Sequence, residues 1–174
     1  MNKTSNLEQL TNFAFYAILQ LTVAQFIVFF HTAYCFVYVA FFLLLPRREG
    51  ALPLFLLVSF AVGILVDMSY NSSGIHALAS VLMVYSRALL LQLMLPASGY
   101  EATTQPTLSR LGWRRFSIFS LILIGIHHTA LFLSDSGGTM MLFFLAMRKA
   151  IFSTLLTYAV VMIIQGVTLV VSKK

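Results

Sequence analysis

The sequence predicts an all-α, polytopic membrane protein: a single integral membrane domain over residues 1–174, built as a bundle of six transmembrane helices. Its composition supports this, since 60% of the residues are hydrophobic and only 9% are charged, whereas soluble domains carry about 25% charged residues. Uncharged apolar stretches of about 20 residues, the length of a bilayer-crossing helix, recur along the chain. The single cysteine, Cys35, excludes a disulfide scaffold.

The first apolar stretch, residues 9–46, contains no charged residue. It is too long for one crossing helix and long enough for two short ones. The polar pair His31-Thr32 interrupts the Phe-rich run, so we expect a break there and spans over about 12–30 and 33–46. One long tilted helix over 9–46, which makes five spans in total, is the alternative.

The remaining four spans follow from charges and turn residues. The next apolar stretch ends at Asp67, and Tyr70 to Gly74 is a turn signal with Asn and Ser able to cap the following helix. That helix stops before Pro96, and the longest polar stretch follows it. Its 17 residues are too few to form a hydrophobic core of their own. We therefore predict spans over about 51–67, 75–95, 115–133 and 149–171.

Basic residues are distributed unequally between the two sides of this arrangement. Arg148 and Lys149 fall on one side, and eight fall on the side of both termini: Lys3, Arg47, Arg48, Arg110, Arg114, Arg115, Lys173 and Lys174. Cytoplasmic loops carry the excess of Lys and Arg, so both termini are expected in the cytoplasm. Because the basic residues lie at the ends of apolar spans, they indicate membrane orientation and no nucleic-acid binding.

Arg87 lies inside the fourth span, where an ionisable side chain is costly and marks a functional position. It either snorkels toward the cytoplasmic surface or faces a helix interface and pairs with a partner chain or a lipid headgroup. His76 is eleven residues earlier, almost three helical turns, so the two share one face. Ser80 lies between them on that face, and with Ala77 it suits close helix approach. This face is expected to point at a cavity or another helix.

Asp67 is predicted near the outer surface together with His76. Its carboxylate is satisfied either by loop backbone N–H groups or water, or by a hydrogen bond with His76 that sets the shape of the loop. Gly74 fits both interpretations, because glycine permits a backbone turn that side chains would block.

All four histidines, His31, His76, His127 and His128, map to the outer half of the bundle. This clustering suggests a haem or metal hypothesis, but the adjacent pair His127-His128 points about 100° apart on a helix and no metal-binding motif accompanies it. We therefore predict no cofactor. There is also no Gly-x-Ser-x-Gly motif and no glycine-rich phosphate loop, so a non-enzymatic protein is expected.

Short motifs follow one another along most of the chain: Leu19-Gln20, Leu44-Leu45-Pro46, 63–68 (GILVDM), 74–77 (GIHA), Tyr85-Ser86-Arg87, Pro96 with Gly99-Tyr100-Glu101, Gly112-Trp113, His127-His128 and Arg148. In their order and spacing they resemble the rod-shape-determining protein MreD family, particularly its Bacteroidetes-like members, over roughly residues 16–158. Two departures matter. Ala88 replaces a proline of many relatives, which implies a straighter fourth helix, and Ala97-Ser98 lacks their charges for a cytoplasmic contact.

The resemblance implies a scaffold of the bacterial inner membrane that serves the cell-elongation machinery and peptidoglycan synthesis. Such proteins bind the single-span protein MreC and help to connect the MreB filament with RodA and its class B transpeptidase. The family is also similar in fold to the substrate-binding membrane subunits of energy-coupling-factor vitamin transporters. A small-molecule binding subunit with an outer cavity around Asp67, His76 and His128 is therefore the alternative function. Self-association is left open.

Overall fold

The chain folds into an all-α helix bundle in the computed structural model, which describes residues 3–48, 50–94, 105–136 and 140–171, and side chains from residue 11 onward except that of Gln25. Among the described residues, four helices are long and apolar enough to cross a membrane, where six spans were expected. They confirm the predicted all-α helix bundle and indicate a membrane-embedded protein. These are α3 (Leu52–Tyr70), α4 (Ile75–Met94), α5 (Leu108–Asp135) and α6 (Met140–Val171).

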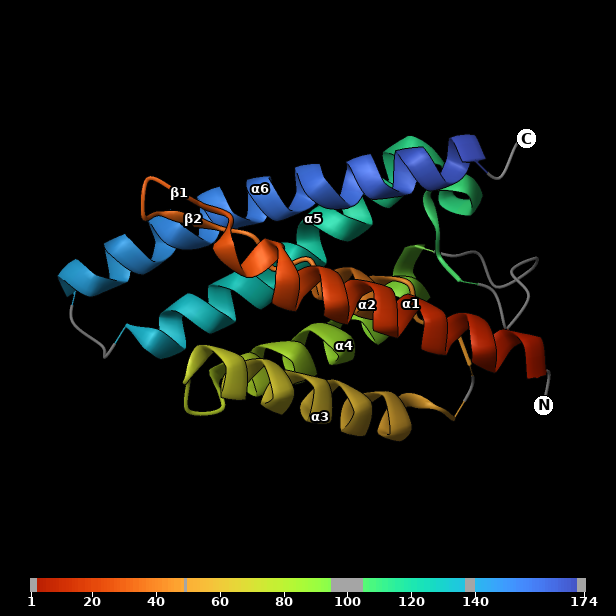
Figure 1. Cartoon of the computed structure of the whole chain (residues 1–174), viewed down its shortest axis with the longest axis horizontal. Coiled ribbons are helices and arrows are strands. Elements are labelled where there is room, and N and C mark those ends of the chain that lie inside the picture. Colours follow the sequence, from red (N-terminus) through yellow and green to blue (C-terminus); the bar gives the residue numbers. More distant parts are fainter. Residues whose placement is uncertain (1–2, 49, 95–104, 137–139, 172–174) are drawn as a thin grey trace.

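The long helices form a layer in which each packs against its neighbour in the chain, in the order α3, α4, α5, α6 (Figure 1). One face of this layer is covered by α1 (Lys3–Thr22) and the five-residue helix α2 (Val39–Leu43). Helices α3 and α4 approach each other closely, because Gly63 leaves room for the backbone of the facing helix. A Cβ atom at Gly63 would lie 2.3 Å from the Cα of Ala77.

A small hairpin connects α1 with α2. After a short 3-10 helix, η1 (Ala24–Phe26), the strands β1 (Val28–Phe29) and β2 (Ala33–Tyr34) pair antiparallel. At the tip Phe30 and His31 adopt φ of 52° and 53°, and the N–H of Thr32 donates to the carbonyl of Phe29 at 3.0 Å. The chain thus reverses at the break that His31-Thr32 predicts.

The spanning helix expected over residues 33–46 is wrong. Only Val39–Leu43 are helical, and the preceding residues run as β2 and irregular backbone. Residues 35–45 are all buried in the bundle. We call residues 33–46 the inner segment. An uncharged apolar run has the same composition whether it is a lipid-facing helix or a chain enclosed by other helices, so composition alone could not separate the two.

Helix ends also differ from the expected spans. α1 ends at Thr22 where a span to residue 30 was predicted, whereas α5 and α6 begin at Leu108 and Met140, before the predicted starts at 115 and 149. α5 is bent at Gly112, whose φ is 72°. Charged residues such as Arg110 and Arg148 indicate where hydrocarbon ends, but a helix continues beyond that boundary as long as its backbone hydrogen bonds are made.

Candidate functional site

The inner segment is the feature around which the buried polar side chains of the bundle gather. Irregular backbone at membrane depth is tolerated only where protein or water satisfies its N–H and C=O groups, because lipid offers no hydrogen bonds. The described helices supply partners along the whole segment, from Tyr34 to Leu45.

The start of the inner segment is held by two hydroxyl groups of α6. The backbone N–H of Tyr34 donates to Oγ of Ser153 at 2.9 Å, and that of Phe36 donates to Oγ1 of Thr157 at 3.1 Å. Ser153 and Thr157 are four residues apart and therefore lie on one face of α6. Both are fully buried. β2 pairs with β1 along one edge, and these hydroxyl groups accept hydrogen bonds in place of a second neighbouring strand.

The middle of the inner segment is held by Gln20 of α1. Its side-chain amide donates to the carbonyl of Cys35 at 3.3 Å and accepts from the N–H of Tyr38 at the same distance. It also donates to the hydroxyl of Tyr70 at 2.9 Å. A carboxamide carries both a donor and an acceptor, so one buried side chain satisfies two backbone groups.

The end of the inner segment is held by Arg87 of α4. Its Nε donates to the carbonyl of Leu43 at 3.3 Å, and an Nη donates to the carbonyl of Leu45. Carbonyls at a helix C-terminus have no partner within the helix, so the guanidinium caps α2. Arg87 is 3% exposed, which excludes snorkelling to the surface. It faces an interface, as the second interpretation expected, but the groups that it binds belong to its own chain.

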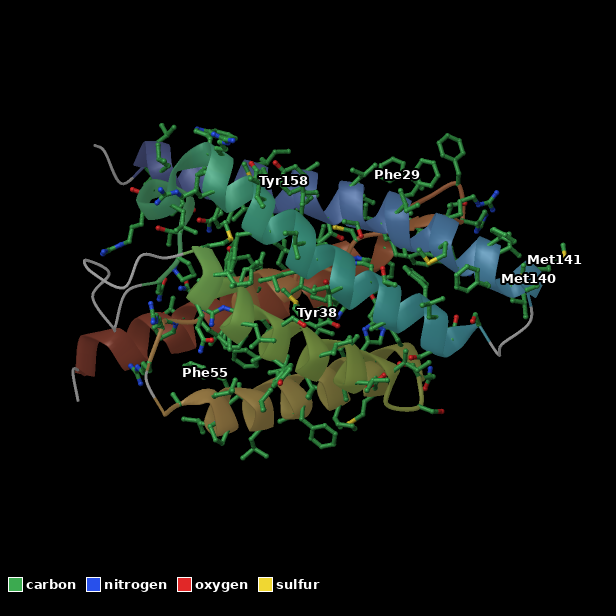
Figure 2. All side chains as sticks on the ribbon, turned by 180° about the vertical axis from the view of Figure 1, so that it is seen from behind. Phe29, Tyr38, Phe55, Met140, Met141 and Tyr158 are labelled. Carbon is green, nitrogen blue, oxygen red and sulfur yellow. The ribbon has the colours of Figure 1, made fainter. Side chains whose placement is uncertain are left out.

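The hydroxyl of Tyr38 joins two helices through their histidines. It lies 3.0 Å from Nδ1 of His76 on α4 and 2.7 Å from Nε2 of His127 on α5, and it can donate to one nitrogen and accept from the other. His128 lies beside this pair, with Nδ1 at 2.8 Å from the carbonyl of Ile124 and Nε2 at 3.3 Å from Oγ1 of Thr157. Figure 2 shows Tyr38 in the middle of the bundle.

We call these four residues, Tyr38, His76, His127 and His128, the histidine cluster. Aromatic rings enclose it, and the ring of Phe36 lies 5.1 Å from that of His76 and 5.4 Å from that of His128. The fourth histidine, His31, is exposed at the hairpin tip and does not join the cluster. Among the described residues, no three His, Cys, Asp or Glu side chains are arranged to hold a metal ion.

Two polar atoms at the histidine cluster are buried without a hydrogen-bond partner in the described part of the chain: Oγ of Ser80 and Nδ1 of His127. An unsatisfied buried polar group costs about 1–3 kcal/mol. Among the described residues, these two atoms are therefore the groups of the cluster at which a further hydrogen-bond partner would stabilise the fold.

Asp67 connects the end of α3 to the beginning of α4. Its carboxylate accepts from the backbone N–H groups of His76 and Ala77 at 3.0 and 2.9 Å, and from Oγ of Ser72 at 2.5 Å. A carboxylate at a helix N-terminus satisfies free N–H groups and interacts favourably with the helix dipole. The backbone interpretation of Asp67 is therefore the one that the structure shows, and its bond with His76 goes to the main chain. Gly74 has a φ of 83° at this turn.

The structure brings the sequence-predicted site residues together in two places. The first place is the α3–α4 turn with the adjoining histidine cluster, and it holds Asp67, Gly74, His76, Ala77, Ser80, His127 and His128. The second is the far end of the same α4 face, which holds Arg87. The face was expected to point at a cavity or another helix. It is covered by the inner segment, of which only Val39–Leu43 are helical. Sequence reasoning did not select Gln20, Tyr38, Ser153 or Thr157 as site residues. Gln20 entered only through the Leu19-Gln20 motif, and the other three carried no signal beyond a polar side chain within an apolar run.

Comparison with known proteins adds no relative: no protein-family model, no curated protein and no solved structure matches the chain. The likeness to the MreD family therefore rests on the order of the motifs in the sequence.

Proposed function

We propose that the chain is a non-enzymatic scaffold of the bacterial inner membrane that serves the cell-elongation machinery and binds the single-span protein MreC. The observation that supports this best is the use of the buried polar side chains. Gln20, Arg87, Ser153 and Thr157 all bind the backbone of the inner segment, so they stabilise a shape. Such a bundle offers partners a fixed arrangement of helix faces.

The surface best suited to a partner helix lies on α6. In its most apolar stretch only 22% of the residues are buried, against 50% for α5, so most of its circumference faces outward. Beside it is a groove of about 470 Å³, lined by Trp113, Met162, Ile163, Gly166, Val167, Val170 and Val171. A Cβ atom at Gly166 would meet nothing within 4 Å. Small residues of this kind let transmembrane helices approach closely.

The assignment to cell elongation comes from the motif resemblance, which names the partners. MreC supplies the single transmembrane helix that the groove would receive. RodA, its class B transpeptidase and the MreB filament would be linked to the chain through this complex. His76 and Arg87 are 4% and 3% exposed, so they influence a partner only through the inner segment that they hold.

Copurification from native membranes tests the scaffold. The tagged full chain is expected to capture MreC, and Gly166→Leu, which fills the groove, is expected to reduce that capture several-fold at an unchanged melting temperature. Leu57→Trp places similar bulk on an exposed position of α3 and serves as the control. If Gly166→Leu captures MreC as well as the wild type, the groove is not the binding site. If the wild-type chain captures no MreC at all, the proposed role in cell elongation is wrong.

The excess of basic residues on the terminal side supports an orientation with both termini in the cytoplasm. The inner membrane as location comes from the motif resemblance. Reporter fusions at the two ends test this orientation. Both are expected to be active with a cytoplasmic reporter, and activity with a periplasmic reporter at either end contradicts it.

A small-molecule binding subunit of a transporter is the second candidate, and the histidine cluster favours it. Oγ of Ser80 and Nδ1 of His127 are the polar atoms that a ligand would satisfy there. A bound ligand stabilises the fold in proportion to its affinity and concentration. This candidate predicts that a vitamin-like compound raises the melting temperature of the chain and that His127→Phe abolishes the increase. A screen without any shift, alongside stoichiometric capture of MreC, decides for the scaffold.

A further inference from the structure

A basic cavity lies where the inner segment leaves the bundle. It has a volume of about 320 Å³ and lies between the beginning of α3 and the end of α4. Its lining includes three arginines, Arg47, Arg48 and Arg87, and no described lining residue carries a carboxylate. Glu49 follows Arg48 in the sequence and is outside the described residues.

Arg87 forms the deepest charged part of this lining. Two of its five N–H donors bind the carbonyls of Leu43 and Leu45, which leaves further donors of a fork that fits phosphate oxygens. Because the inner segment fixes the side chain, little conformational entropy is lost when an anion binds. Arg47 is half-buried at the same cavity and supplies a second guanidinium.

The other walls of the cavity are apolar. Leu52 and Phe55 of α3 and Val84, Ala88 and Leu91 of α4 contribute to its lining, with the amide of Gln92 at its edge. A free anion would gain nothing from these walls, whereas an acyl chain would bury apolar surface on them. The combination of a basic end and an apolar wall between transmembrane helices is typical of sites for anionic lipid headgroups.

We propose that this cavity binds the phosphate-bearing headgroup of an anionic phospholipid, with Arg47 and Arg87 contacting the phosphate and α3 and α4 contacting the acyl chain. In the orientation set by the basic residues, the cavity opens at the cytoplasmic surface, where anionic headgroups are available. The lipid then lies against the end of the inner segment and neutralises the guanidinium that holds it. This proposal does not depend on the identity of a protein partner.

Native mass spectrometry of the purified full chain in detergent tests the proposal. Phosphatidylglycerol is titrated in parallel with phosphatidylcholine of the same acyl chains and with inorganic phosphate. Phosphatidylglycerol is expected to bind most tightly. Arg47→Gln is expected to lower its affinity about fivefold, the effect of one basic side chain near a membrane surface. Arg115→Gln removes the same charge from an exposed position outside the cavity and is expected to leave the affinity unchanged.

Three results would overturn the proposal. Equal affinities for phosphatidylglycerol and phosphatidylcholine would show that headgroup charge does not determine binding. Equal losses of phosphatidylglycerol affinity in Arg47→Gln and Arg115→Gln would show attraction to the whole basic surface and no specific site. Inorganic phosphate that binds as tightly as phosphatidylglycerol assigns the cavity to a soluble anion. Arg87→Lys, which keeps the charge and loses the planar fork, is expected to lower lipid affinity as well. If Arg87→Lys does not fold, the comparison of Arg47→Gln with Arg115→Gln still decides the test.

Discussion

The Nε of Arg87 donates a hydrogen bond to the carbonyl oxygen of Leu43, 44 residues earlier in the chain, at a distance of 3.3 Å. This contact joins α4 to the end of α2 and explains how a guanidinium is stable at membrane depth. A buried charge is expensive unless oriented dipoles replace the water that it loses. The carbonyls of Leu43 and Leu45 provide those dipoles, and Arg87 in turn satisfies carbonyls that α2 leaves free.

Replacement of Arg87 by alanine is expected to destabilise the bundle by about 3 kcal/mol, because it leaves buried carbonyl groups without donors. Unfolding of the purified protein in mixed micelles, followed by circular dichroism, measures the change. Arg115→Ala removes an equal charge from an exposed position of α5 and is the control. Equal stability of the two variants would show that Arg87 does not support the inner segment.

Replacement of Thr157 by valine removes the acceptor for the N–H of Phe36 and keeps the shape of the side chain. We expect a loss of about 1–3 kcal/mol, since the buried N–H is left unsatisfied. Thr168→Val is the matched control on the same helix, because Oγ1 of Thr168 is exposed and bonds only within α6, to the carbonyl of Ile164. Faster hydrogen exchange at the amide of Phe36 in Thr157→Val alone would accompany the loss.

Replacement of Gly63 by alanine is expected to force α3 and α4 apart, because the added Cβ would lie 2.3 Å from the Cα of Ala77. Overpacking of this kind costs about 1–3 kcal/mol. Gly125→Ala is the control, since its Cβ would meet only a side-chain methyl of Thr154, at 3.9 Å. The melting temperatures of the two variants and the wild type are measured in detergent. The prediction is wrong if both variants melt at the same temperature as the wild type.

Replacement of Asp67 by alanine removes the cap from the N-terminus of α4. The loss of a capping side chain costs about 0.5–2 kcal/mol, and the freed N–H groups of His76 and Ala77 are buried here. Asp135→Ala changes an exposed carboxylate near the C-terminal end of α5 and is expected to have little effect. Hydrogen exchange should rise at the first turn of α4 in Asp67→Ala and stay low in the control.

The α3–α4 hairpin could be predicted to within three residues at its helix ends. The spans expected over 51–67 and 75–95 correspond to Leu52–Tyr70 and Ile75–Met94. Here the sequence carries strong local signals: a charge at the end of one apolar run, then Asn, Ser and Gly that form the turn. Such signals act over a few residues and do not depend on the rest of the fold.

The inner segment could not be predicted in this way, because what keeps it from being a helix lies elsewhere in the chain. Its partners Ser153 and Thr157 are more than a hundred residues away, and each is a single polar residue in an apolar run. The alignment of His76 and Arg87 on one face of α4 was predictable from helical spacing. What covers that face was not, since any element with free backbone groups would satisfy the same side chains.

The distance in sequence between the inner segment and α6 has a consequence for biosynthesis. The amides of Tyr34 and Phe36 find their acceptors on the last helix, 119 and 121 residues later. A nascent chain emerges from its N-terminus, so these amides are made long before their acceptors leave the ribosome. Until then they need water or the membrane-insertion machinery as a substitute. The inner segment can therefore make these two hydrogen bonds only after α6 has been translated.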